Sequence, residues 1–136
     1  MKYLHYIKES IDDNIKLDIK DIAIELVDYG FDYETKDCKY YKDNEHGDEC
    51  FAIEIKDSKE RFFRLEDLSE VLLRIRDYVK NTNYSIDIGI PKDATYLSLE
   101  DFLEEFEDEE LYEMEIYIYD NRRHTTMKHL KNIRII

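Results

Sequence analysis

Hydrophobic residues recur at helical spacing in two long segments of this 136-residue chain. From Ile11 to Leu26 they fall every three or four positions, with Ser10 at a capping position before them and Gly30 at a C-terminal cap position after them. The segment Leu65–Lys80 carries an apolar stripe of the same kind. Both segments are predicted to be amphipathic helices whose apolar sides face a core.

Elsewhere apolar and polar residues alternate, which predicts strands. Residues 31–57 read as a hairpin around a polar turn at 43–48. Tyr84–Ile90 is predicted to be a further strand, which Pro91 closes because proline has no N–H to donate. The alternation returns from Leu111 to Asp120 and predicts a half-buried strand there. The polar side of that strand carries Glu113, Glu115, Tyr117 and Tyr119.

A third helix is predicted between the last two strands. Ser98 to Asp101 reads as a capping box, and the apolar face that Leu99 and Phe102 begin would end near Glu109. The order is therefore helix, strand, strand, helix, strand, helix, strand, which indicates a single α+β domain over residues 1–136. Strands with one solvated face favour a mostly antiparallel sheet of four to five strands, with two to three helices on one face. Residues 1–9 are predicted to form an arm or a further helical turn, and 121–136 a basic C-terminal segment that adds a strand or a short helix.

The composition argues against several classes of protein. Hydrophobic residues make up 43% of the chain beside 40% charged residues, and this apolar share argues against wholesale disorder. The net charge of −14 opposes direct binding of nucleic acid, because the phosphates would be repelled. The chain opens on no signal peptide, and no run approaches the roughly 18–20 apolar residues that a membrane span needs. These patterns favour a cytoplasmic protein without a membrane partner.

Charge is concentrated in one part of the chain. Residues 100–120 carry a net charge of −11, and eight acids fall between Glu100 and Glu110. A continuous helix would align these acids in two outward columns, at about one charge per 2 Å against roughly 1.7 Å in duplex DNA. The expected partner-binding residues are Glu100, Asp101, Glu104, Glu105, Asp108 and Glu109. A solvated helix face explains the same pattern, because like charges four residues apart cost only a few tenths of a kcal/mol.

Basic residues follow the acidic run, and residues 121–136 carry a net charge of +5. The candidates for gripping an anion such as a phosphate are Arg122, Arg123, Lys128 and Lys131. Alternatively, these side chains fold back on the acidic helix or on a neighbouring subunit. Surface ion pairs of that kind are worth about 0–1 kcal/mol each, so only several together would fix an orientation.

The two cysteines are expected to face each other. Cys38 and Cys50 lie equally far from Asn44, the expected centre of the hairpin, so the strands would place them directly opposite. The prediction is two buried, reduced thiols, while a tetrahedral metal site with His46 or a redox-active disulfide stays open. Their spacing matches no zinc motif, and three glycines form no nucleotide-binding loop. We therefore expect no metal, no cofactor and no enzymatic activity.

The first ten residues, Met1-Lys2-Tyr3-Leu4-His5-Tyr6-Ile7-Lys8-Glu9-Ser10, resemble the start of small, uncharacterised acidic accessory proteins of tailed bacteriophages. The composition, rich in Lys, Ile, Asp, Glu and Tyr, is similar to theirs as well. The resemblance implies a protein that modulates a host and acts in the host cytoplasm. Several groups of such proteins are acidic inhibitors of nucleic-acid-binding defence enzymes.

Together these patterns favour a non-enzymatic acidic protein that binds a basic surface of a partner protein, as a phage-type inhibitor or DNA mimic. Such a partner would itself be a nucleic-acid-binding protein. Two alternatives stay open. One is a small-ligand or nucleotide-binding module that uses the basic C-terminal segment, with Tyr117 and Tyr119 lining a pocket rather than only covering a strand. The other is a structural subunit of a homo-oligomer without independent activity.

Overall fold

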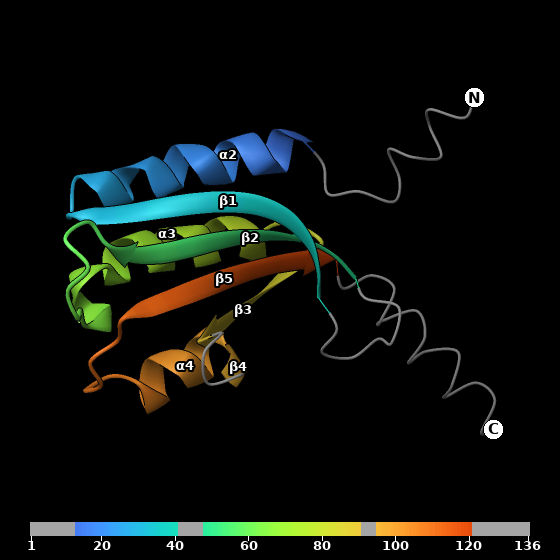
Figure 1. The fold of residues 1–136 in the computed structure, drawn as a ribbon. Coiled ribbons are helices and arrows are strands. Elements are labelled where there is room, and N and C mark those ends of the chain that lie inside the picture. The colour runs from blue at the N-terminus through green and yellow to red at the C-terminus, as the bar shows by residue number, and fades with distance from the viewer. Residues whose placement is uncertain (1–12, 41–47, 91–94, 121–136) are drawn as a thin grey trace, which may run out of the picture.

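Five antiparallel strands form one sheet in the computed structural model, which describes residues 13–40, 48–90 and 95–120 (Figure 1). The strands are β1 (Phe31–Tyr40), β2 (Asp48–Asp57), β3 (Tyr84–Ile90), β4 (Thr95–Ser98) and β5 (Glu113–Asp120). Their spatial order is β1-β2-β5-β3-β4, so β5, the last in sequence, lies in the middle of the sheet. The predicted α+β class with an antiparallel sheet is confirmed.

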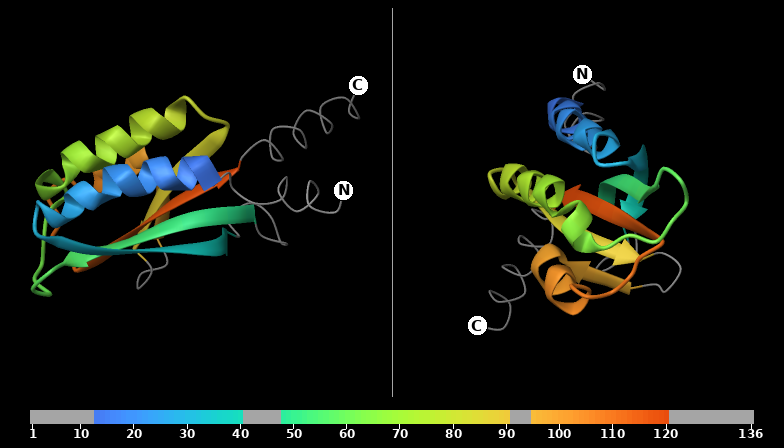
Figure 2. Two further views of the ribbon diagram at one scale, coloured as in Figure 1. Left: turned by 90° about the horizontal axis from the view of Figure 1, so that it is seen from above. Right: turned by 90° about the vertical axis from the view of Figure 1, so that its left-hand side faces the viewer.

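The helices cover one face of this sheet. They are α2 (Asp13–Ala23), which continues as a 3₁₀ turn over Ile24–Val27, α3 (Ser69–Lys80) and α4 (Leu99–Glu105). Figure 2 shows α2 and α3 side by side over the same side of the strands, and α4 lies beside β3 and β4. The three helices share one hydrophobic cluster with the strands, which confirms the prediction that helices pack on one face.

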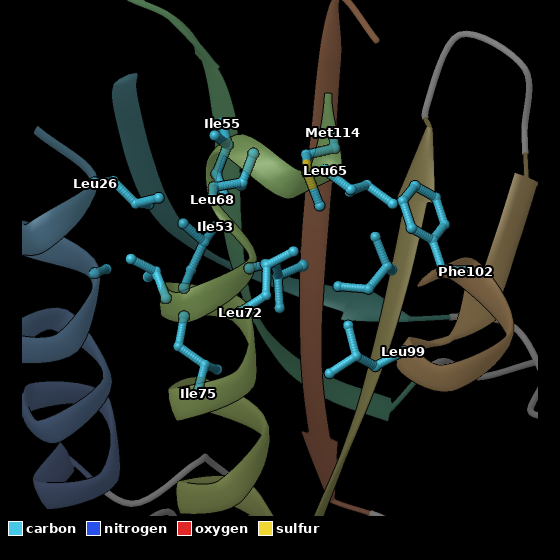
Figure 3. Close-up of a cluster of buried hydrophobic side chains, with 14 of the residues drawn as sticks. Leu26, Ile53, Ile55, Leu65, Leu68, Leu72, Ile75, Leu99, Phe102 and Met114 are labelled. Atoms are coloured by element: carbon cyan, nitrogen blue, oxygen red, sulfur yellow. The ribbon is translucent and has the colours of Figure 1, made fainter. Parts of the chain in front are cut away.

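The core lies between the helices and this face. Figure 3 shows its side chains meeting from α3, β2, β5 and α4. Each fully buried Leu, Ile, Phe or Met contributes about 1.5–3 kcal/mol relative to an exposed one. The largest fully buried members include Ile53, Ile55, Leu72, Ile75, Leu99, Phe102, Met114 and Ile116. These residues come from the apolar positions of the predicted helices and strands, so the periodicity identified the core.

The helix predicted over Leu65–Lys80 is interrupted near its start. Leu65–Asp67 forms a 3₁₀ turn, and Leu68, with φ −133°, separates it from α3. The Asp67 carboxylate accepts a hydrogen bond from the Arg64 backbone N–H at 3.0 Å and so caps the short turn. Leu65 and Leu68 are both buried, as the predicted apolar stripe requires, so the interruption leaves their place in the core unchanged.

The third helix is shorter than predicted. α4 ends at Glu105, where the Phe106 N–H still donates to the Phe102 carbonyl, and residues 106–108 form a turn. The prediction of a helix to about Glu109 is therefore wrong. The chain leaves the helix because Leu111 pairs through its backbone with Phe63, with N···O distances of 2.7 and 2.8 Å. A longer helix would carry Leu111 away from that position.

Two further features of the sheet were not predicted. β4 is a four-residue strand, too short to show a period, and its register pairs Ile88 with Leu97. β5 was predicted to be half-buried but is buried on both faces, and Glu115, Tyr117 and Tyr119 are each only 8% exposed. Tyr40, at the end of β1, packs on Tyr117 and Tyr119 on the side of β5 that the helices leave open, and Lys36 and Tyr117 contact Glu115 there.

Several predictions fall outside the described residues. They concern the Ser10 cap, the turn around His46, Pro91, the arm at 1–9 and the basic C-terminal segment with Arg122, Arg123, Lys128 and Lys131. Gly30 is described, and its φ of +89° is the left-handed conformation that ends the turn after α2. None of the described helices is long and apolar enough to cross a membrane.

Candidate functional site

The eight acids of the segment Glu100–Glu110 are all exposed. Leu99 and Phe102 anchor its helical part in the core, and the Ser98 hydroxyl caps it by accepting a hydrogen bond from the Asp101 N–H at 3.3 Å. All six predicted partner-binding side chains point away from the core: Glu100, Asp101, Glu104, Glu105, Asp108 and Glu109. Glu107 and Glu110 are exposed as well. The segment therefore presents eight carboxylates to solvent.

The acids predicted to form two columns on one helix do not all lie on that helix. Only Glu100, Asp101, Glu104 and Glu105 lie on α4, whose seven residues span about 10 Å. Asp108 lies in the following turn and Glu109 beyond it. The prediction of two three-membered columns on one helix is therefore wrong, and the match to the phosphate spacing of DNA does not hold over the whole segment.

Seven acids elsewhere in the described residues have a Lys or Arg partner within 4.0 Å. Lys16 contacts Asp37 at 2.8 Å, Arg61 contacts Asp57 at 3.3 Å, and Arg74 contacts Glu25. Within residues 13–40, 48–90 and 95–120, none of the eight acids of the segment Glu100–Glu110 has such an ion pair. This segment is therefore an uncompensated negative surface in the described part of the molecule.

A second group of acids lies on the sheet face opposite the helices, here called the open face. The strand register places Glu34 of β1, Glu54 of β2 and Glu115 of β5 in one row across three strands. Like charges in adjacent register positions repel each other. Lys36 offsets this repulsion, because its ammonium lies 2.5 Å from the Glu54 carboxylate and 3.6 Å from that of Glu115.

The two neighbouring glutamates of this row have opposite pKa shifts. The hydrogen bond from Lys36 lowers the pKa of Glu54 below its usual range. Burial raises the pKa of Glu115 above its usual range, and Glu54 beside it acts in the same direction. The Tyr117 hydroxyl donates a hydrogen bond to Glu115 and opposes the rise. Glu115 is therefore the member of the pair that holds a proton more readily.

These shifts predict how the pair contributes to stability. Ionising Glu115 costs folding free energy as the pH rises from the ordinary glutamate range, about 4.3, through its raised pKa. Glu115→Gln cannot ionise, so its melting temperature should exceed that of the wild type by a few degrees at pH 8. The difference should shrink at pH 4.5, where the wild-type side chain holds its proton. Differential scanning calorimetry at the two pH values measures it.

The control for this prediction is Glu113→Gln, which removes one charge from the same side of β5 at a more exposed position. It should change the melting temperature less than Glu115→Gln at pH 8. A Glu115→Gln protein that is less stable than the wild type at pH 8 would contradict the inference that ionised Glu115 destabilises the fold.

A groove of about 630 Å³ runs over one end of the open face. Its volume lies within the range of about 300–1,000 Å³ that is usual for small-ligand sites. Its charged lining residues are one lysine and five acids: Lys56, Asp32, Glu34, Glu54, Glu113 and Glu115. Such a lining would repel the phosphates of a nucleotide and favour a cationic group. The basic segment invoked for nucleotide binding lies outside the described residues.

Four tyrosines gather beside the groove, over the centre of the open face. The Tyr40 ring stacks on that of Tyr117 with centroids 5.0 Å apart, and Tyr96 contacts both rings edge-on. Below them Asp87, only 4% exposed, accepts a hydrogen bond from the Tyr40 hydroxyl at 2.8 Å and a longer one, at 3.4 Å, from Tyr119. Because the rings fill the space between them, they form a packed cluster rather than the tyrosine-lined pocket that stayed open from the sequence.

This cluster depends on Gly89, whose role no local sequence pattern indicates. A Cβ placed on Gly89 would lie 2.5 Å from Cδ1 of Tyr96 and 2.9 Å from the Thr95 carbonyl oxygen. The absence of a side chain at Gly89 lets the Tyr96 ring lie close to the backbone of β3. The alternating pattern of β5 identified Tyr117 and Tyr119 as candidates. Tyr40, Tyr96 and Asp87 lie beside them only because of the strand order, which no local sequence pattern predicts.

The cysteines lie where the hairpin symmetry predicted. Cys38 of β1 and Cys50 of β2 are direct partners in the strand register. Both are free thiols, with Cys50 buried and Cys38 half-buried against the tyrosine cluster. Among the described residues, no group of three or more His, Cys, Asp or Glu side chains is arranged to hold a metal ion.

Similarity to known proteins assigns no function to the acidic segment or to the open face. Comparison of the chain with models of known protein families, with curated protein sequences and with solved structures found no match.

Proposed function

We propose that this is a non-enzymatic acidic protein that binds a basic surface of a partner protein through the segment Glu100–Glu110. The observation that carries the proposal is the density of exposed and uncompensated negative charge in this segment. This segment presents eight exposed carboxylates within eleven residues and none of them has a counter-ion among the described residues, whereas seven acids elsewhere are paired with Lys or Arg. An uncompensated patch of one sign raises the rate of encounter with a partner of the opposite sign.

The arrangement favours a basic protein surface over any anion. The net charge of −14 repels nucleic acid, and the acid-lined groove on the open face repels phosphates locally. A rigid anchor supports the patch, since Leu99 and Phe102 are both fully buried. The α4 surface is therefore presented in a fixed orientation, which reduces the entropy lost on binding.

Imitation of DNA is not a necessary part of this proposal. Four carboxylates on a seven-residue helix and four in the following segment form a short patch rather than a long regular array. Such a patch matches a cluster of Lys and Arg side chains on a partner, which is also what a nucleic-acid-binding protein offers. The resemblance to phage accessory proteins supports a host protein as that partner.

The test replaces four acids of the segment by their amides, as Glu104→Gln, Glu105→Gln, Asp108→Asn and Glu109→Gln together. Exposed ion pairs contribute about 0–1 kcal/mol each, so the loss of four should weaken binding roughly 30-fold. Immobilised wild-type protein should capture a defined partner from a lysate of the source organism or its host at low salt and release it at high salt. The variant should fail to capture that partner.

A matched control separates the patch from the overall charge. Asp21→Asn, Asp28→Asn, Glu60→Gln and Glu66→Gln remove the same number of charges from exposed positions far from the segment in the sequence. This control should retain nearly all of the captured partner. Equal capture by the wild type and the segment variant, or equal loss in both variants, would contradict the proposal.

A further inference from the structure

We propose that Cys38 and Cys50 form a reversible disulfide within one chain, by exchange with a low-molecular-weight disulfide such as oxidised glutathione. The proposal rests on their juxtaposition, because the two residues are direct partners on neighbouring antiparallel strands. It is independent of the acidic segment and of its partner.

The register satisfies the geometric requirement for a disulfide. Directly opposed residues on antiparallel strands have Cα atoms about 4.5 or 5.5 Å apart, depending on whether the pair is hydrogen-bonded. Disulfides join Cα atoms about 4.4–6.8 Å apart, so both kinds of pair lie within reach. Cys38 and Cys50 therefore need a change of side-chain rotamer rather than a movement of β1 against β2.

The two thiols differ in a way that suits sequential exchange. Cys38 is half-buried and so within reach of a small oxidant, while Cys50 is only 2% exposed. The hydrogen bond with Cys50 lowers the pKa of Cys38, and Lys36 acts in the same direction. The hydrogen bond with Cys38 and burial raise the pKa of Cys50. Cys38 is therefore the first thiolate, and Cys50 is the resolving thiol behind it.

The reaction proceeds by two exchanges. The Cys38 thiolate attacks one sulfur of oxidised glutathione, forms a mixed disulfide and releases one glutathione thiolate. Cys50 then loses its proton to solvent, and its sulfur attacks the Sγ of Cys38 and expels the second glutathione thiolate. Two protein thiols are oxidised and one glutathione disulfide is reduced to two glutathione thiols, so atoms and electrons balance.

The test incubates the full-length protein in glutathione buffers of increasing oxidised fraction. The reaction is then quenched in acid, free thiols are alkylated, and the intact mass is measured. We expect a monomer that has lost two hydrogen atoms and takes up no alkylating group, with full recovery of both thiols in reduced glutathione. Cys50→Ala should stop at the mixed disulfide on Cys38, and Cys38→Ser should react far more slowly because Cys50 is buried.

The wild-type protein alone decides the outcome, so failure of either variant to fold leaves the test intact. Three results would overturn the proposal. They are a mixed glutathione disulfide as the stable end product, two thiols that remain open to alkylation in fully oxidised buffer, and a disulfide that links two chains on a non-reducing gel.

Discussion

Replacing Phe102 by alanine is expected to lower the free energy of unfolding by about 3–5 kcal/mol, the range for large-to-small aromatic substitutions in a core. Phe102 is fully buried, and its ring stacks on that of Phe106 with centroids 4.6 Å apart. It also attaches α4 to the core beside Leu99, as Figure 3 shows. The loss would therefore open a cavity at the end of the sheet and loosen the acidic segment together with the fold.

Urea unfolding followed by circular dichroism measures this change. The matched control is Phe62→Ala, because the Phe62 side chain is 66% exposed and its main aromatic contact is an edge-on one with Tyr112. It should cost about 1 kcal/mol or less. A similar loss of stability in the two variants would show that Phe102 is not part of a well-packed core.

Replacing Asp87 by alanine is the second change with a large expected effect. It removes a buried acceptor from the Tyr40 hydroxyl, and from Tyr119 at longer distance. A buried donor left without its charged acceptor costs about 2–3 kcal/mol, and this should appear as a lower midpoint in urea. Asp87→Asn keeps an oxygen acceptor at the same place and should lose less.

A double-mutant cycle separates this hydrogen bond from the general cost of altering β3. Tyr40→Phe removes the hydroxyl but keeps the ring that stacks on Tyr117. In the Tyr40→Phe background, Asp87→Ala should lower the free energy of unfolding by about 1–2 kcal/mol less than in the wild type, because no Tyr40 hydroxyl remains to lose its acceptor. Strictly additive effects would mean that Tyr40 and Asp87 do not depend on each other.

Local patterns predicted most of the fold, because most of its elements carry a helical or an alternating pattern of apolar residues. The strand at Tyr84–Ile90 and the position of Cys38 opposite Cys50 in the hairpin register were both predicted and are confirmed, since a period of two and a symmetric hairpin are local properties. The short β4 and the early end of α4 were not predicted. The four residues of β4 are too few to show a period, and the end of α4 depends on the pairing of Leu111 with the distant Phe63, which the local sequence does not specify.

The candidate site was predicted less completely than the fold. Exposure of the acidic segment follows from its charge and needed no tertiary information. The open face could not be anticipated, because Glu54, Glu115 and Lys36 belong to three strands whose neighbourhood depends on the order β1-β2-β5. Burial of Tyr117 and Tyr119 likewise comes from Tyr40, which reaches over them from the end of β1.

The central place of β5 has a consequence for how the chain acquires its structure during synthesis. The hairpins β1–β2 and β3–β4 are made first, and each then exposes an unpaired edge, β2 in one and β3 in the other. Neither edge finds its partner until residues 113–120 leave the ribosome. Ile116 of β5 pairs with Ile53 of β2 on one side and with Ile88 of β3 on the other, so β5 connects the two hairpins. Closure of the sheet is thus a late, long-range step, and the growing chain exposes two unpaired strand edges until β5 has been made.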